Sequence, residues 1–581
     1  MKKAIFQSIS IVFLLFAHPL VGFAETTDVV FKAMQDEIAR SMKNLKLNGH
    51  EGPYFISYRV TEYDTARFAA ASGAITDNTD THWRNLRVDV REGNYHLDSS
   101  GFNMRPTAAL SALSGSVGGA ITIDNDYDAI RNALWLHTDT AYKTAIKNFE
   151  AKKNFLEQNN IQERPDDFSQ EVATVSVEKP TKEEDCTHWR SITKSLSAIF
   201  RQYPAIQRST ATFTTNKVTN WLVNSEGTKV RQSENQYSLI VMASLQADNG
   251  MQLADNRLFC SNSLSDLAKE EEIKHAIKDM IDNLIALKSA PLAKEYRGPI
   301  LLEGQASAEF VNELLRYNFG HAQEILSSSE NSSSSKRNPL KNLLGQSIMP
   351  SFLSIVDDPL SEKFHGRPII GGYKIDEEGV PAQKIVLVDK GVLKTFCTSR
   401  TPTLYTKQSN GHAIGNIGEA SILYVNSDNQ LSAKELKEKL IDLGKKAGLK
   451  QVMIAKRLST YDSAIFNPSS LAAEIRANAS NSSSNSLFVR SPLLLYSVSV
   501  DDGHEELVRG ALFSAISIDK LRDIVCTGND AKPYFTLAID PGELAYYHLV
   551  CPSLLFSEIE LHEPDKETDK LPILPSPLAE K

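Results

Sequence analysis

Two hydrophobic patterns occur in this chain, and together they predict a mixed α+β fold. Residues 52–100 contain the runs PYFISYRVTEYD and RNLRVDVREGNYHLDSS, in which apolar and polar residues alternate as they do in half-buried strands. Residues 264–288 instead repeat Ile, Met and Leu every three or four positions, which is the pattern of an amphipathic helix. Ser432 and Glu435 form a capping box before a second helix over 433–447.

The length of 581 residues allows two to four domains at about 100–200 residues each. Pro291 follows the first of these helices, and since proline cannot continue a helix, we place a domain boundary there. We expect an N-terminal α/β domain over 25–292, a mixed sheet with helices and an insertion near 100–190, then a β-rich domain over 293–565 and a Pro-rich tail over 566–581.

The net charge of -9 argues against nucleic acid as a partner, because binding phosphates requires clustered Lys and Arg, and no basic block is present. None of the five cysteines forms a C-x-x-C pair. We expect most of them to be small buried residues; the alternative is that two of them form one disulfide bond.

The N-terminus has the pattern of a secretory signal peptide. Lys2 and Lys3 precede a short apolar run, and Ala24 ends a Gly-Phe-Ala sequence with small residues at the cleavage positions. The alternative is an uncleaved anchor helix, but the apolar run is shorter than the roughly 20 residues that span a bilayer. We expect residues 1–24 to be removed, which predicts a periplasmic or secreted protein without stable membrane insertion.

Residues 297–326 change from an apolar strand into a helix, and the helix carries the main chemical candidates. Glu313, Tyr317 and His321 have i, i+4, i+8 spacing and are expected to share one face. A carboxylate, a phenol and an imidazole there could do acid/base work or bind a metal, whereas the alternative is a polar face at a domain interface. The apolar positions can face a core: Phe310, Leu314 and Ile325.

Several segments then resemble one family in the order in which that family carries them. The run GPILL before a helix with Asn-Glu, the block GGYKIDEEGVPAQKIVLVDKGVLKTF, the segment SNGHAIGN and the strands DGHEELVRGALFSAIS and PSLLFSEIEL resemble the TldD/PmbA family. This is a family of zinc-dependent protease-like proteins once called modulators of gyrase. The resemblance covers 297–560 well and 30–100 loosely, and it implies a barrel-like β domain with packed helices in the second half.

Catalytic members of this family carry H-E-x-x-x-H on the helix, with two histidines as zinc ligands and the glutamate as base. In the ungapped match the histidines are replaced by Asn312 and Tyr317, while Glu313 is kept. A second register, with a four-residue insertion, matches Gly320-His321, but it does not restore the motif either. Amide and phenol oxygens are poor substitutes for imidazole, and the family's cysteine ligand has no counterpart here. We therefore assign no metal ligands and expect no cofactor.

Three functions remain open. The first is a PmbA-like subunit without the zinc site, which handles extended peptides or unfolded segments as a homodimer or a heterodimer with an active TldD-like partner. Glu313, Arg316, Tyr317 and His321 then line the degenerate site, and the peptide is bound by Asn312, Arg316, Tyr317 and His321. The second is an active metallopeptidase with a rearranged zinc site, in which Glu313 is the base and metal is recruited by His321 with one of three other histidines, His365, His412 or His504. The third is an envelope binding or scaffold protein.

Overall fold

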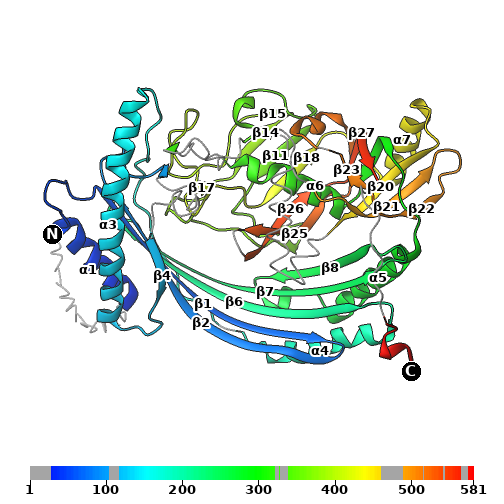
Figure 1. Ribbon diagram of the computed structural model, residues 1–581, viewed down its shortest axis with the longest axis horizontal. Coiled ribbons are helices and arrows are strands. Elements are labelled where there is room, and N and C mark those ends of the chain that lie inside the picture. The colour runs from blue at the N-terminus through cyan, green and yellow to red at the C-terminus, as the bar shows by residue number, and fades with distance from the viewer. Residues whose placement is uncertain are drawn as a thin grey trace, which may run out of the picture.

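The computed structural model describes residues 28–103, 117–182, 184–320, 326–327, 338–459, 489–514, 516–540, 543–563 and 574–580. Both halves of the chain contain helices and strands, so the predicted α+β class is confirmed (Figure 1). The predicted signal segment 1–24 lies outside the described residues. No helix in the described ranges is both long enough and apolar enough to cross a membrane.

A long, curved sheet dominates the N-terminal half (Figure 1). It has seven strands in the order β4-β2-β1-β6-β7-β5, with β8 also paired to β7. The alternating runs form its longest members, and β1 and β2 pair along their whole length, from Phe55 opposite Arg91 to Ala71 opposite Ala74. The strands are β1 (Phe55–Ala71), β2 (Ala74–Arg91), β4 (Val117–Ile121), β5 (Val175–Val177), β6 (Arg208–Asn224), β7 (Lys229–Gln246) and β8 (Gln252–Ser261).

Four helices cover this sheet. Helices α1 (Val29–Asn44) and α3 (Tyr127–Gln158) pack on each other at one end, and α4 (Thr187–Ala198) and α5 (Glu270–Ser289) pack toward the other (Figure 1). Helix α5 is the helix that the periodicity predicts, although it begins at Glu270 because Leu264–Asp266 forms a separate 3-10 turn. Its buried side chains are the predicted ones: Ile273, Ile277, Met280, Ile281, Leu284 and Leu287.

The C-terminal half contains two larger open sheets. The first has the order β15-β14-β11-β18-β26-β25, and the second has the order β19-β24-β27-β9-β20-β21-β22, with β23 also paired to β27. Their strands are β9 (Tyr296–Leu302), β11 (Leu353–Asp357), β14 (Ile385–Asp389), β15 (Val392–Leu393), β18 (Leu423–Ser427), β19 (Gln430–Leu431), β20 (Gln451–Leu458), β21 (Pro492–Ser499), β22 (Glu505–Val508), β23 (Leu512–Phe513), β24 (Ile524–Gly528), β25 (Lys532–Asp540), β26 (Glu543–Cys551) and β27 (Leu554–His562).

The prediction of a barrel-like β domain is wrong, because none of the sheets formed by the described residues closes into a barrel. The reason is helix α6 (Gln305–Leu315), which contacts β20 of one sheet and β25 and β26 of the other. A helix packed between two sheets separates them, so their edges do not meet. Helix α7 (Ala433–Lys446) covers the second sheet and begins with the predicted Ser432–Glu435 capping box.

Short ladders complete the described fold. They are β3 (Phe102–Asn103) with β10 (Leu326–Ser327), β12 (Lys363–Phe364) with β13 (Arg367–Pro368), and β16 (Ala413–Ile414) with β17 (Ile417–Gly418). The first of these joins the two halves of the chain, since β3 follows β2 in the N-terminal half whereas β10 follows α6.

Candidate functional site

Helix α6 is positioned by the strand before it and by a glycine at the turn between them. Strand β9 is buried from Gly298 onward, and Gly304 then turns the chain with a φ of +51°. A Cβ at Gly304 would lie 2.7 Å from the hydroxyl oxygen of Tyr534, so this close approach requires glycine. Phe310 and Leu314 are fully buried, as the helical pattern predicts.

Glu313 lies on this helix and is held by a buried arginine. Its Oε2 accepts a hydrogen bond from the backbone N–H of Arg490 at 2.7 Å, and its Oε1 accepts one from the Nε of the same residue. The two side chains are only 7% and 5% exposed. Burial raises the pKa of Glu313, and the charge of Arg490 acts in the opposite direction. Glu313 is therefore an engaged ion-pair partner in this structure.

Arg316 places a second positive charge at the end of α6. Its side chain is 1% exposed and forms an ion pair with Glu419. Its guanidinium lies over the ring of Tyr547 and 5.1 Å from the ring centroid of Tyr317. Asn312 is buried, whereas Tyr317 is half exposed, so these two positions lie in different environments.

The expected shared face of Glu313, Tyr317 and His321 is not formed, because α6 ends too early. The helix stops at Leu315, and a 3-10 turn over Tyr317–Phe319 follows. Gly320 is then extended and pairs with Cys397 in a backbone bridge. His321 lies outside the described residues.

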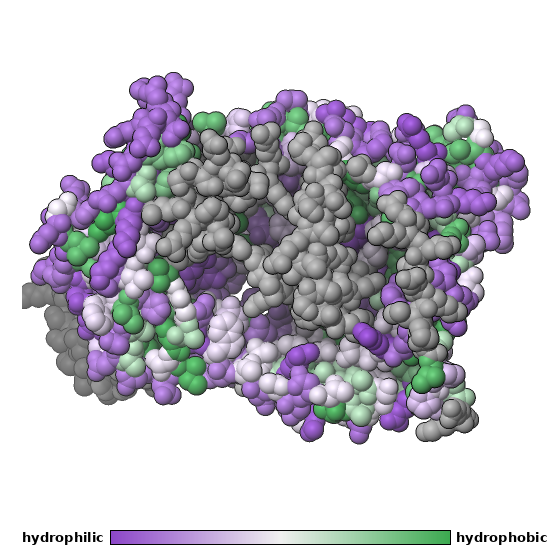
Figure 2. All heavy atoms as spheres, viewed as in Figure 1, coloured by the Kyte–Doolittle hydropathy of each residue, from purple (hydrophilic) through white to green (hydrophobic). Residues whose placement is uncertain are grey.

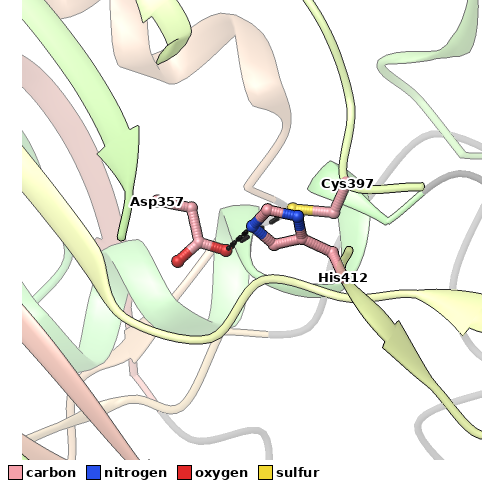
Figure 3. A group of neighbouring side chains, drawn as sticks. All are labelled: Asp357, Cys397 and His412. Carbon is pink, nitrogen blue, oxygen red and sulfur yellow. Dashed lines mark hydrogen bonds and ion pairs between the residues drawn. The ribbon is translucent and has the colours of Figure 1, made fainter. Parts of the chain in front are cut away.

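Of the three other candidate histidines, His412 alone belongs to a group of three metal-ligating side chains in the described part of the chain. His365 and His504 are exposed, and His504 follows the glycine of a turn. His412 is fully buried together with Asp357 and Cys397, and the ligand atoms of the three residues lie within 4.8 Å of one another (Figure 3). The five cysteines are free, and four of them are buried, as the sequence predicts.

A cavity of about 700 Å³ lies between the long sheet and the C-terminal half. Figure 2 shows the hollow between these parts, with mainly hydrophilic side chains on its walls. Alternate residues of β7 form part of the wall, as expected for one face of a strand: Val230, Gln232, Glu234 and Gln236. Tyr547 also lines the cavity and connects it to Arg316 on α6.

The charge of the cavity wall is predominantly negative. Six carboxylates line it, namely Glu178, Glu234, Asp266, Glu362, Asp376 and Glu377, and three cations, namely Arg59, Lys363 and Lys374. Arg59 pairs with Glu377, and Lys374 pairs with Glu178. The remaining lining charges are thus mostly unneutralised carboxylates, which favour cationic groups on a bound chain.

The acidic block 375–383 joins this wall to the N-terminal sheet. Asp376 accepts hydrogen bonds from the backbone N–H groups of Glu378, Val380 and Ala413, and burial raises the pKa of Asp376 to about 6. Glu378 accepts the backbone N–H of Arg400. Burial and the charge of Asp376 raise the pKa of Glu378 to about 7.

Comparison with known proteins agrees with this architecture. Residues 297–453 match the sequence profile of the PmbA/TldA metallopeptidase C-terminal domain. This part of the chain is thus a C-terminal domain of the TldD/PmbA type. A protein of Methanothermobacter thermautotrophicus named as a metalloprotease is 26% identical over 202 residues, which are 35% of this chain and 41% of that relative. The chain thus matches about two fifths of the length of this family relative.

Two solved structures of the family type share the fold. A Thermotoga maritima protein proposed to be a modulator of a DNA gyrase superposes with a TM-score of 0.57 and 16% identity, covering 91% of this chain and 99% of the other. TldE from Thermococcus kodakarensis superposes with a TM-score of 0.55 and 12% identity, covering 91% and 100%. Identities this low show the fold alone.

The counterions of Glu313 and Arg316 could not be identified from the sequence. Arg490 is 177 residues from Glu313, and Glu419 is 103 residues from Arg316. Charged residues in loops give no periodic signal, so the pairs could not be matched. The group of Asp357, Cys397 and His412 was also missed. The segment SNGHAIGN pointed to His412 alone, and nothing in the sequence spacing linked it to the other two.

Proposed function

We propose that this chain is a PmbA-like subunit of a peptide-handling assembly and lacks the catalytic zinc of its family. The observation that supports this most strongly is the pair of buried arginines beside α6. Arg490 forms an ion pair with the retained Glu313. Arg316 is paired with Glu419 and directly precedes the position of the family motif's second histidine. A zinc ion needs electron-donating ligands, whereas this region offers two guanidinium groups, a buried amide and a half-exposed phenol.

These residues do not fit a zinc ion on α6, so we derive no catalytic step through one. A base in a zinc peptidase must be able to take a proton from a bound water. In this chain the carboxylate oxygens of Glu313 already accept hydrogen bonds from Arg490. Arg316 contacts Tyr317 and reaches the cavity through Tyr547, whereas Asn312, Arg316 and Tyr317 do not themselves line it.

The cavity is the proposed peptide site. Its volume of about 700 Å³ is within the range of ligand pockets, which is about 300–1,000 Å³. It runs along the face of β7, where polar side chains can bind the backbone of an extended segment. Since carboxylates outnumber cations on the wall, we propose that segments with lysine or arginine bind best.

The partner and the location are also part of the proposal. The family contains metallopeptidase relatives, and a TldD-like subunit would supply the hydrolytic site that this chain does not have. The signal pattern of residues 1–24 supports export to the periplasm or beyond. Amino-terminal sequencing of the protein from its native envelope is expected to begin at Glu25, and a chain that retains Met1 in the cytoplasm would contradict export.

Peptide binding is tested by fluorescence anisotropy with labelled extended peptides of equal length, one rich in lysine and one rich in glutamate. The lysine-rich peptide is expected to bind more tightly, and Glu234→Arg should weaken it several-fold. Glu438→Arg, on the exposed face of α7, is the matched control and should bind like the wild type. If neither peptide binds, the peptide-handling role is wrong, and the scaffold alternative is favoured.

The alternative of an active peptidase with a rearranged site has weaker support. His412 is the only one of its candidate histidines that the described structure places in a group of three metal-ligating side chains, and it is fully buried. Glu313, the base of that alternative, is bound to Arg490. A buried histidine group without a free base beside it does not provide a hydrolytic site.

A further inference from the structure

Asp357, Cys397 and His412 form a compact buried group in the C-terminal half (Figure 3). Asp357 ends β11, Cys397 pairs through its backbone with Gly320 beyond α6, and His412 directly precedes β16. All three side chains have no exposed surface. One carboxylate oxygen of Asp357 is 3.3 Å from Nε2 of His412 and 3.6 Å from Sγ of Cys397.

The hydrogen bonds of His412 fix which ring nitrogen is protonated. Its Nδ1 lies 2.9 Å from the backbone oxygen of Asn410 and 2.9 Å from the side-chain oxygen of the same residue. The Asn410 amide is oriented by its neighbours, since its oxygen accepts the N–H of Thr398 and its nitrogen donates to Phe396. Two acceptors therefore face Nδ1, which must carry the proton.

In the neutral form of the His412 ring, the lone pair of Nε2 faces Asp357 and Cys397. Nε2 is buried, and its 3.3 Å contact with Asp357 does not have the geometry of a hydrogen bond. A lone pair that faces a carboxylate is repelled unless a cation lies between them or the ring takes a second proton. An Nδ1 that donates to a carbonyl while Nε2 remains open is the arrangement of histidines that bind metal ions.

Two of the three separations between ligand atoms match those around a zinc ion. With Zn–N and Zn–O bonds of about 2.0–2.2 Å and a Zn–S bond of about 2.3 Å, tetrahedral ligands lie about 3.4 Å apart for N and O and about 3.6 Å apart for S and O. The observed separations are 3.3 Å and 3.6 Å. The third pair of ligand atoms, Nε2 of His412 and Sγ of Cys397, lies within 4.8 Å, so the three groups are near enough to close around one ion.

We propose that Asp357, Cys397 and His412 bind one zinc ion in the interior of the C-terminal half, apart from the family positions on α6. Binding releases the thiol proton of Cys397 to solvent, so a divalent ion, a carboxylate and a thiolate together carry no net charge. Such neutrality allows the group to remain buried.

The hydroxyl of Tyr373 lies within electrostatic range of Asp357 and Cys397. It is buried without a hydrogen-bond partner among the described residues, and burial together with the charges of Asp357 and Cys397 raises its pKa. The ion has a structural role, since it joins three segments beside the cavity. Ala413, next to His412, and Ser421, which hydrogen-bonds Asp357, both line the cavity wall.

The test uses the full-length mature chain, purified without a histidine tag, stripped of metal and then loaded with one equivalent of Zn²⁺ or Co²⁺. After desalting, elemental analysis should find one ion per chain. The cobalt form should show a thiolate-to-cobalt charge-transfer band in the near ultraviolet. Cys397→Ser and His412→Gln should each weaken binding at least tenfold, whereas Cys526→Ser, at another buried thiol, should bind like the wild type.

X-ray absorption of the zinc-loaded wild type gives an answer that does not depend on how the variants fold. One sulfur and two or more nitrogen or oxygen neighbours are expected. A wild type that retains no metal, a cobalt form without the thiolate band, or metal that survives Cys397→Ser would overturn the inference and favour an imidazolium–carboxylate ion pair. Each of these results concerns the metal alone and leaves the peptide-binding test of the proposed function independent.

Discussion

Glu313 and Arg490 form a buried ion pair, so neutralising either partner leaves the other as an uncompensated charge. Arg490→Met is expected to lower the free energy of unfolding by about 3 kcal/mol. The double variant Glu313→Gln/Arg490→Met should recover much of this loss, because neither charge remains buried. Urea denaturation of the wild type, both single variants and the double variant measures the coupling, and additive effects would show that the pair does not interact.

Glu378 predicts a pH dependence of stability. Its folded pKa of about 7 is above its usual value, so the folded state binds more protons than the unfolded state between about pH 4.5 and 7. Stability from this group therefore falls as pH rises through that window. Glu378→Gln removes this titration. The free energy of unfolding of the variant, relative to the wild type, should therefore rise by about 1–3 kcal/mol from pH 4.5 to pH 8.

Urea midpoints of the wild type and Glu378→Gln, measured across this pH range, give the comparison. Glu438→Gln on α7 serves as the exposed control and should follow the wild type at every pH. A difference between Glu378→Gln and the wild type that stays constant with pH would show that the carboxyl is not perturbed by folding.

Sequence reasoning found the residue types of the α6 region but not their partners. Glu313 was identified from local spacing, which depends only on the helix, and Arg316 from the match to the family motif. Their counterions are distant in the chain, and the fold alone decides that they meet. The same limit applies to His412, whose neighbours come from a strand end and from a loop.

At the scale of elements, the end of α6 depends on Gly320. A Cβ at this position would lie 2.2 Å from the backbone oxygen of Gly418, so the chain after α6 can approach the backbone of Gly418 this closely only with glycine. Gly320→Ala is expected to destabilise the protein by about 1–3 kcal/mol, as overpacking does. Gly119→Ala on β4, where the nearest atom is 3.6 Å from the added Cβ, is the matched control. Thermal unfolding of both variants tests this, and equal melting temperatures would contradict the close packing.

The helices with complete local signals were predicted well, and those that depend on tertiary contacts were not. Helix α7 has its capping box and apolar stripe in one short segment, and it begins at the predicted residue. Helix α6 has a continuing polar pattern beyond Leu315, but pairing of Gly320 with Cys397 ends it. A local pattern cannot report a pairing made by a segment far along the chain.

At the scale of the whole molecule, the mixed class follows from the sequence, whereas the closure of the sheets does not. Both strand and helix patterns are local, so the α+β class could be predicted. Whether the edges of two sheets meet depends on what packs between them. The apolar faces of α6 do not indicate the order of the strands in the sheets on either side of the helix. The cavity likewise arises where β7 faces the 359–377 segment, which is distant in the sequence.

The central claim is that this family member binds peptides without cleaving them. The most direct measurement incubates the purified mature chain, without a partner, with extended peptides and added zinc, and follows the products by mass spectrometry. The account predicts intact peptides from the wild type and from Glu313→Gln alike. Cleavage by the wild type that chelator stops and that Glu313→Gln abolishes would contradict it and establish the rearranged peptidase.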